Sequence, residues 1–337
     1  MQIAIDTAGG DFAPRNIVAG ALVAARHLDV GLTLVGDRGA IEKELARHGG
    51  AGRVDIRFVE TSDVVGMAET PVAALRQKPK SSVRQAADVV ARGEASAFFS
   101  AGNTGASLLA ARTAFGLLPG VERPALATAI PTRRGSAVLL DAGANVECRP
   151  QHLVQFAAMG CVYARLSLDV ARPTVGLLSI GEEASKGNDL TRDAHQRLRA
   201  SGLEFIGNIE ARDVYTGQAD VIVCDGFTGN IALKISEGLV EVVEALLREE
   251  LARTFTTRFG YLLSRRAFRR FRRRVDYSEV GGAPLLGVAG VCVVGHGCSS
   301  AKAVRNAVVL AHRFASQGFV ERVAGEIAGI GGESRVS

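Results

Sequence analysis

The sequence predicts an α/β protein of three layers, α/β/α, in which helices cover both faces of a mostly parallel central sheet. Short β-branched or apolar segments that end in Gly, Asp or Asn alternate along the 337 residues with longer segments of helical period. This alternation is typical of parallel strands joined by helices. Glycine accounts for 39 residues, well above the usual ~7%, which indicates many tight turns between strands and helices.

Each expected strand is an apolar run that stops where turn residues begin, as the first one does at Asp6. In chain order, strands are expected at 2–6, 33–36, 55–59, 97–100, 137–141, 174–179, 204–206, 221–224 and 290–294. The helices between them carry apolar residues at helical spacing and begin near capping or turn residues. They are expected at 14–27, 40–48, 71–77, 83–92, 105–115, 152–165, 190–201, 229–253 and 300–317. Because no repeat or low-complexity linker divides the chain, we expect one domain over 1–337, with a basic amphipathic helical insertion at about 240–276.

Composition excludes several classes of protein. Hydrophobic residues make up 47% and charged residues 22%, the balance of a soluble globular chain. The longest nearly apolar run, around 285–294, is well short of the ~20 residues that a membrane span needs. Five cysteines without a C-x-x-C pair predict neither a disulfide framework nor a zinc site, and free thiols fit a reducing cytoplasm. Met1 leads directly into a strand-like segment, so no signal peptide is expected.

Two early loops have residues suited to binding an anion. The loop at 6–14 places Gly10 before Pro14, which can begin a helix whose unpaired N–H groups favour negative charge. The loop at 100–105 ends in Asn103, Thr104 and Gly105, a group of amide and hydroxyl donors framed by glycines. It is not a P-loop, because Gly-Lys-Ser/Thr is missing, and it contains no G-x-G-x-x-G fingerprint. For the loop at 6–14, taken alone, an ordinary turn between strand and helix is an equally good explanation.

Later loops add charge and a titratable group. Lys186 stands between Ser, Gly and Asn residues at a strand end, where its ammonium group could hold phosphate or an anionic transition state beside Asn188. Asn230 and Lys234 share one helix face at i, i+4. His296 lies in a Gly-rich loop, where proton transfer and a purely structural role are both open.

Another loop, at 141–148, repeats the pattern of glycine and amide residues at a strand end. Cys224, at the start of the 224–230 loop, is expected to be a buried strand residue rather than a nucleophile, because no histidine follows nearby. Six such loops in one chain indicate an anion-binding site more strongly than any one of them does. No metal cluster and no Ser-His-Asp order can be assembled from them.

Read together, these segments resemble the bacterial phosphate acyltransferase (PlsX) family over residues 3–300. The matching segments are IAIDTAGGDFAP, SAGNTGA, LLPGVERPALA, LDAGANVEC, IGEEASKGND, FIGNIEARDV, CDGFTGNIALK and YSEVGGAPLLGVAGVCVVGHGCSS. This sequence departs from the family pattern at Thr7-Ala8, at Ser179 and at Cys298, which interrupts the His-Gly-Ser-Ser ending.

The resemblance implies a reaction, a fold and partners. Inorganic phosphate would attack the thioester of long-chain acyl-acyl-carrier protein, giving acyl phosphate and free carrier protein, and acyl phosphate would feed a downstream glycerol-3-phosphate acyltransferase in phospholipid synthesis. The implied fold is Rossmann-like, related to phosphotransacetylases and isopropylmalate-type dehydrogenases, in a homodimer at the inner face of the membrane. A phosphotransacetylase that uses small acyl-CoA substrates is the alternative.

The implied chemistry needs neither cofactor nor metal, because amides, helix N-termini and one ammonium group can hold an anion and an oxyanion. We expect the residues that act directly in catalysis to be Lys186, Asn188, Asn230 and His296. The expected phosphate contacts are Gly10, Asn103, Thr104, Gly105 and Lys234. Asp6 and Asp225 are expected to orient their loops.

Net charge of +5 comes from one segment, because residues 253–274 contain nine arginines and no acid. Apolar residues recur there at helical spacing, and such a basic amphipathic segment suits an anionic membrane surface or an acidic carrier protein. A solvated hairpin packed on a dimer partner is a further interpretation, and nucleic acid is not expected, because no recognised nucleic-acid fold accompanies the run. The candidate docking residues are Phe259, Leu262, Arg265, Arg266, Arg269 and Arg270. The protein is therefore expected to be cytoplasmic and peripherally membrane-associated.

Overall fold

The computed structural model describes residues 1–275 and 281–333. Residue 276 of the expected insertion and residues 277–280 of the last matching segment lie outside the described residues. The nine predicted strands and nine predicted helices are confirmed, with ends shifted by a few residues. The strands, however, form two sheets instead of one central sheet.

The larger sheet contains seven strands, and five of them form a continuous parallel block. Its strands are β1 (Gln2–Asp6), β2 (Gly31–Gly36), β3 (Ile56–Glu60), β4 (Ala97–Ser100), β5 (Ala125–Leu126), β11 (Ala283–Leu286) and β12 (Val291–Val294). Their order is β3-β2-β1-β4-β12-β11-β5, with β11 antiparallel to both of its neighbours. Because chain order reverses beside β1, the carboxyl ends of β1 and β4 form the crevice where open α/β sheets bind ligands.

The smaller sheet contains five strands and is also mostly parallel. Its strands are β6 (Thr128–Thr132), β7 (Gly135–Leu140), β8 (Val175–Leu178), β9 (Phe205–Ile209) and β10 (Val221–Val223). Their order is β6-β7-β10-β8-β9, and only β6 is antiparallel to its neighbour. Ala127 alone separates β5 from β6, so the chain passes between the sheets at that residue.

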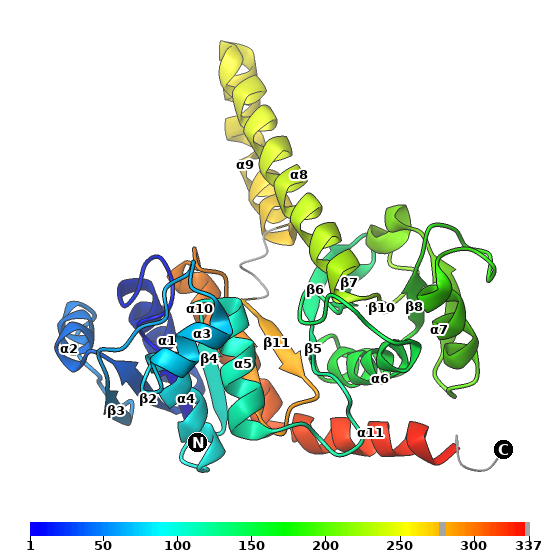
Figure 1. Ribbon diagram of the computed structural model, residues 1–337. Coiled ribbons are helices and arrows are strands. Elements are labelled where there is room, and N and C mark those ends of the chain that lie inside the picture. Colours follow the sequence, from blue (N-terminus) through cyan, green and yellow to red (C-terminus); the bar gives the residue numbers. More distant parts are fainter. Residues whose placement is uncertain (276–280, 334–337) are drawn as a thin grey trace.

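Helices cover the sheets as the alternating pattern requires (Figure 1). They are α1 (Arg15–Leu28), α2 (Arg38–Arg47), α3 (Pro71–Gln77), α4 (Ser82–Ala91), α5 (Thr104–Phe115), α6 (Pro150–Ser167), α7 (Asp189–Arg199), α10 (Ala301–Ser316) and α11 (Phe319–Glu333), with a 3-10 turn at Ala211–Tyr215. On β1, Ile3 and Ile5 belong to the core with α1 and α10, whereas Ala4 belongs to the core with α4 and α5. Alternate residues of one strand therefore pack on opposite layers, which confirms the layered α/β class.

The hydrophobic core continues from one sheet to the other. Val138 of β7 and Val221 of β10 belong to the same buried cluster as Ile3 and Leu32 of the larger sheet. Helix α11 packs on α6, and Arg165 of α6 pairs with Glu326 of α11 at 2.8 Å. The last helix therefore joins the C-terminal end of the chain to the half that contains the smaller sheet.

A long helical hairpin stands away from both sheets (Figure 1). It consists of α8 (Gly226–Arg253) and α9 (Phe255–Val275). Thr254 between them has extended backbone, with φ −126° and ψ 162°, and so ends the first helix. Since α8 begins directly after β10, the hairpin grows out of one of the predicted functional loops.

Candidate active site

Three of the predicted loops meet at the carboxyl ends of β1, β4 and β12, which are neighbours in the larger sheet. The N–H of Asp11 donates to the carbonyl oxygen of Gly297 at 2.8 Å. A Cβ on Gly9 would lie 2.7 Å from the amide nitrogen of Gly102. Only glycine fits at that position, and the close approach holds the loops after β1 and β4 against each other.

Asp6 holds the loops after β1 and β4 together through its side chain. Its side chain is buried and accepts hydrogen bonds from Ser100 Oγ at 2.7 Å and from the N–H of Ala8 at 3.2 Å. Burial raises the pKa of the Asp6 carboxyl, although hydrogen bonds from Ser100 and Ser82 oppose the shift. These contacts join β1 to β4, as a loop-orienting residue would.

The side chain of Asn103, which was predicted to contact phosphate, forms hydrogen bonds with backbone groups of the protein instead. Its Oδ1 caps α5 by accepting from the N–H of Ala106 at 3.0 Å. Its Nδ2 donates to the carbonyl oxygens of Gly66, Met67 and Glu69, at 3.3, 3.1 and 2.9 Å. Both ends of the side chain are thus occupied by the protein itself, and Asn103 holds a segment that the sequence did not single out.

The other predicted phosphate contacts at this sheet are Thr104 and Gly105, which follow Asn103, and Gly10 in the loop after β1. Thr104 and Gly105 form the start of α5, where the leading N–H groups have no partner within the helix. Gly10 has a φ of +106°, and a Cβ there would lie 3.1 Å from the carbonyl oxygen of Ala101. Backbone amides rather than the Asn103 side chain are therefore the donors available for an anion here.

Asp141 organises the corresponding edge of the smaller sheet, although it was not among the predicted site residues. It is fully buried and accepts hydrogen bonds from the N–H groups of Leu126, Gly143, Ala144 and Asn145, at 3.0, 3.1, 2.9 and 2.7 Å. Asn145 Nδ2 donates a fifth at 2.8 Å. Burial raises the pKa of Asp141, and these bonds act in the opposite direction. The signal in the sequence was an Asp followed by small residues and Asn at a strand end, which is typical of a side chain that bonds its own loop.

The start of α8 packs on the loop that Asp141 holds. Asp225 caps the helix by accepting from the N–H and the hydroxyl of Thr228, at 2.9 and 2.8 Å. A Cβ on Gly229 would lie 2.0 Å from the carbonyl oxygen of Asp141, so this helix turn can come so close only with glycine. Asn230 follows and lies beside Gly143. The predicted residues Asp225 and Asn230 are thus placed at the contact between the β7 and β10 loops.

Lys186 lies in the loop between β8 and α7, and its side chain is exposed. Asn188 caps α7 by accepting from the N–H of Thr191 at 2.9 Å. Asn208 supports the loop by donating to the carbonyl oxygen of Glu183 at 2.9 Å. Among the described residues, no hydrogen bond or ion pair joins Lys186 to the other five loops, so the structure does not bring this lysine into direct contact with Asn230.

Lys234 and His296 meet through a carboxylate that the sequence did not indicate. Lys234 Nζ lies 2.8 Å from Glu237 Oε2, and His296 Nε2 lies 3.3 Å from Glu237 Oε1. Burial disfavours the charged carboxylate, but His296 and Lys234 outweigh that effect and lower the pKa of Glu237 to about 2. Lys234, predicted to contact phosphate, is therefore paired with an acid. The i, i+3 spacing of Lys234 and Glu237 on one helix was the available signal.

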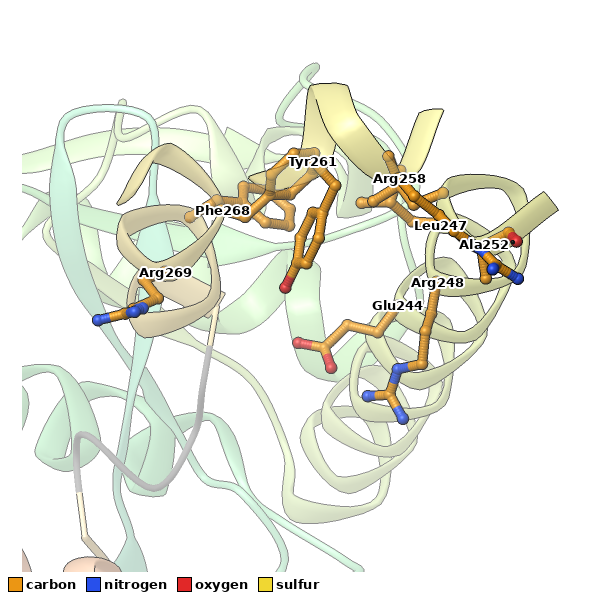
Figure 2. Close-up of a pocket in the computed structure, with 10 residues that line it drawn as sticks. Glu244, Leu247, Arg248, Ala252, Arg258, Tyr261, Phe268 and Arg269 are labelled. Atoms are coloured by element: carbon orange, nitrogen blue, oxygen red, sulfur yellow. Dashed lines mark hydrogen bonds between the residues drawn. The ribbon is translucent and has the colours of Figure 1, made fainter. Parts of the chain in front are cut away.

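An open cavity of about 460 Å³ lies between the two helices of the arginine-rich hairpin (Figure 2). Tyr261 and Phe268 of α9 line it together with Leu247 of α8. The ring centroids of Tyr261 and Phe268 are 5.2 Å apart. The predicted apolar face is thus divided. Phe268 and Phe271 line the cavity, whereas Phe259 and Leu262 are 57% and 61% exposed. Among the predicted docking arginines, Arg269 lies at the cavity and Arg265, Arg266 and Arg270 are exposed.

Two kinds of feature are absent from the described residues. In 1–275 and 281–333, no group of three or more His, Cys, Asp or Glu side chains is arranged to hold a metal ion. Within the same ranges, no helix combines the length and apolar content that crossing a membrane requires.

Comparison with known proteins assigns the family. A family model described as "Fatty acid synthesis protein" matches residues 1–322. A Geobacter sulfurreducens protein named Phosphate acyltransferase is 48% identical over 324 residues, which cover 96% of this chain and 93% of that protein. A protein of the same name from Acidobacterium capsulatum is 48% identical over 327 residues, covering 97% of each chain. This chain belongs to the phosphate acyltransferase family. The predicted resemblance and enzyme class are confirmed.

Solved structures of other proteins have the same fold as this chain. A phosphotransacetylase from Streptococcus pyogenes superposes with a TM-score of 0.65 at 16% identity, covering 94% of each chain. A branched-chain phosphotransacylase from Enterococcus faecalis superposes with a TM-score of 0.54 at 15% identity, covering 94% of this chain and 99% of that one. These likenesses confirm the predicted Rossmann-like α/β fold.

Proposed function

We propose that this phosphate acyltransferase transfers a long-chain acyl group from the thioester of an acyl carrier protein to inorganic phosphate. The products are acyl phosphate and the free carrier protein. The observation that carries the proposal is that glycine-rich loops and helix N-termini gather at the carboxyl ends of both sheets, and that contacts join the two groups. Asp141 bonds Leu126 of the larger sheet, and Glu237 of α8 reaches His296. Such elements suit an oxyanion or a phosphate better than a neutral substrate.

For this reaction, the protein mainly has to hold the charged reacting groups in place. Phosphate near pH 7 is already a nucleophile, and a thiol with a pKa of ~8.5 is a good leaving group. Gly10, Thr104 and Gly105 would hold phosphate through backbone amides, while Lys186, Asn188 and Asn230 would stabilise the negative charge that develops on the carbonyl oxygen of the thioester. Lys186 and Asn230 would act on the same oxyanion only when substrate is bound between them.

A covalent acyl-enzyme is not part of this scheme. Cys224 begins the 224–230 loop, and it is buried at the end of β10. Burial raises the pKa of its thiol well above the ordinary value, with the charges of Asp225 and Asp141 acting in the same direction. A thiol that does not ionise is a poor nucleophile. Cys224 therefore has no role as a nucleophile in this scheme.

The direct test mixes purified protein, palmitoyl-carrier protein and phosphate, and traps acyl phosphate as the hydroxamate. We expect product that depends on phosphate and falls strongly in Lys186→Ala. No product above that variant would refute the proposal. Parallel reactions with palmitoyl-CoA and acetyl-CoA separate the alternative, because a preference for acetyl-CoA would make the protein a small-acyl phosphotransacetylase.

The hairpin supports peripheral binding to an anionic membrane, where acyl phosphate would reach a glycerol-3-phosphate acyltransferase. Phe255 at its tip is 85% exposed, and Leu263 further along α9 is 72% exposed. Phe259 and Leu262 add further exposed apolar surface among the arginines of α9. Aromatic and aliphatic side chains mixed with arginine are suited to the interface of anionic lipids.

An apolar stripe along α8 supports a homodimer. Ile235, Leu239, Val242 and Leu246 are 66%, 61%, 55% and 58% exposed, and their spacing of four, three and four residues is that of a helix–helix seam. A second copy would cover the stripe in a self-complementary contact. Leu239→Arg should convert a dimer to a monomer in light scattering, and a wild-type chain that is already monomeric would contradict this part of the proposal.

A further inference from the structure

The cavity between α8 and α9 lies on the same face of α8 as Asn230, one of the predicted site residues. Asn230 and Glu237 are seven residues apart, and Glu244 and Leu251, which line the cavity, continue the same spacing. Because seven residues are close to two helical turns, these four side chains lie in one row along the helix. The candidate site and the cavity are therefore successive stretches of a single helix face.

Apolar residues follow this face from the candidate site to the cavity. Leu233, Val240 and Leu247 are also seven residues apart, all three are half-buried, and Leu247 belongs to the cavity lining. The exposed stripe proposed above as a dimer contact lies on a different face, because its member Leu239 precedes Glu244 by five residues, or about 140° around the helix. The dimer contact and the cavity therefore do not compete for one occupant.

The walls of the cavity are mainly apolar and aromatic. On the α9 side, the rings of Tyr261 and Phe268 lie together (Figure 2). Charged residues complete the lining, and an arginine can lay its aliphatic stem on apolar surface while its guanidinium stays in water. The volume of about 460 Å³ is within the range of ~300–1,000 Å³ that is usual for small-molecule sites. The apolar and aromatic lining residues are Leu247, Leu251, Ala252, Tyr261, Phe268 and Phe271. Such walls suit a hydrocarbon chain.

The cavity lies at a distance from the candidate site that a long acyl chain can span. Measured along the helix axis from Glu237, which contacts His296, the cavity extends from ~10 Å at Glu244 to ~22 Å at Ala252. One leaflet of a bilayer, which is one acyl chain deep, contains ~15 Å of hydrocarbon. A palmitoyl thioester held at the site loops would therefore place its last carbons beside Leu247, whereas an octanoyl chain would end before the cavity.

We propose that the cavity between α8 and α9 binds the distal part of a long, unbranched acyl chain whose thioester lies at the candidate active site. The inference rests on the acyl transfer proposed above and adds the part of the protein that selects chain length. The half-buried face of α8 guides the chain from Asn230 to the cavity. Each methylene that the cavity removes from water should favour the longer substrate by about fourfold.

Leu247→Trp is the sharpest variant, because it fills the cavity where the end of a palmitoyl chain would lie. The measurement compares kcat/KM for palmitoyl-carrier protein with kcat/KM for octanoyl-carrier protein in buffer without lipid. Wild type should prefer palmitoyl, and the ratio of the two values should fall at least tenfold in Leu247→Trp. Ala245→Trp adds the same side chain at an exposed position on another face of α8 and should keep the wild-type ratio. A wild-type ratio in Leu247→Trp would overturn the inference.

Photolabelling locates the chain in the wild-type protein and so does not depend on how a variant folds. Palmitoyl-carrier protein with a diazirine near the last carbon of its acyl chain is irradiated with the protein in the absence of lipid, and the labelled peptides are identified. We expect label within 244–252 or 258–271. Label confined to other segments would show that the chain lies elsewhere and would overturn the inference.

The inference and the proposed function fail in different ways. A wild-type protein that makes no acyl phosphate from either thioester refutes the acyl transfer itself. An active wild type whose Leu247→Trp variant keeps the preference for palmitoyl leaves the acyl transfer standing and refutes only the cavity as the acyl site. If that variant instead changes only the mass of the assembly in light scattering, the cavity is a contact between copies of the chain and the inference is wrong.

Discussion

The N–H of Leu126 donates a hydrogen bond to Asp141 Oδ1 at 3.0 Å, so a side chain after β7 of the smaller sheet holds β5 of the larger one. In the same place, the Ala142 N–H donates to the carbonyl oxygen of Leu126 at 2.8 Å. These bonds fix the junction at which the two groups of candidate site loops approach each other.

We predict that Asp141→Asn destabilises the protein and lowers activity. An amide would point its NH₂ at donors that now face a carboxylate oxygen, and leaving buried donors unpaired should cost about 2–4 kcal/mol of unfolding free energy. Denaturant unfolding measures the change. Asp169→Asn, at an exposed position with φ 55° that Asn tolerates, is the matched control and should be close to neutral. Equal stability of the two variants would contradict the role given to Asp141.

Asn103→Ala should release the segment at 66–69 as well as weaken α5. Loss of the helix cap costs about 1 kcal/mol, and the carbonyl oxygens of Gly66, Met67 and Glu69 lose their shared donor. Hydrogen exchange should become faster at 66–69 and at the first turn of α5. Asn103→Asp keeps the capping oxygen and removes the donor, so exchange should rise at 66–69 more than at α5. If exchange in both regions stays at the wild-type rate, Asn103 does not anchor this segment.

Lys186→Ala should reduce kcat/KM by about 10²–10³-fold, the effect of removing one group that stabilises developing charge. Because the Lys186 side chain is exposed, the temperature of unfolding should hardly change. Steady-state kinetics and thermal unfolding, with the exposed Lys43→Ala as control, separate the two effects. A Lys186→Ala enzyme with wild-type kinetics would remove this residue from the catalytic set.

Charge reversal of the hairpin tests its partner. Replacing Arg265, Arg266, Arg269 and Arg270 by Glu should abolish sedimentation with anionic vesicles and leave kcat for soluble substrate largely intact. The control reverses four scattered exposed arginines, which gives the same net charge; they are Arg53, Arg112, Arg172 and Arg199. Loss of carrier-protein affinity with unchanged vesicle binding would identify the hairpin as a docking site for the carrier protein instead.

Stability should depend on pH through Glu237. Its pKa is lowered to about 2 in the folded protein from an ordinary value of 4.5, so its contribution is complete above pH 4.5 and is lost as pH falls toward 2. Wild type should therefore unfold at a higher temperature than Glu237→Gln at pH 6, and the difference should shrink between pH 4.5 and pH 2.5. A difference that stays constant over this range would show that the carboxylate is not held ionised by His296 and Lys234.

The sequence predicted the layered fold well because most strands and helices carry strong local signals. It missed β5, which is too short to show a period, and β6 and β11, which contain Pro131 and Pro284 and so argue against strands. It also missed α11, where glycines such as Gly325 and Gly329 reduce helix propensity. Without β5, β6 and β11, the division into two sheets could not be foreseen.

The candidate site was predicted loop by loop, and the pairings between loops were not. Asp6 and Asp225 have the contacts of loop-orienting residues, whereas Asn103 is engaged with a segment 34 to 37 residues away in sequence. Glu237 contacts His296 and Asp141 contacts Leu126, and nothing in a local motif records contacts between such separate parts of the chain. The roles of the donors toward phosphate stay predictions.

In the proposed reaction, inorganic phosphate itself attacks an acyl thioester on the carrier protein. The most direct measurement supplies phosphate with heavy oxygen at all four positions together with palmitoyl-carrier protein, and weighs the acyl phosphate formed and the protein afterwards. We expect palmitoyl phosphate that retains all four heavy oxygens, and an enzyme without an attached acyl group. Free palmitate with no acyl phosphate, or an acylated enzyme that forms when phosphate is left out, would contradict it.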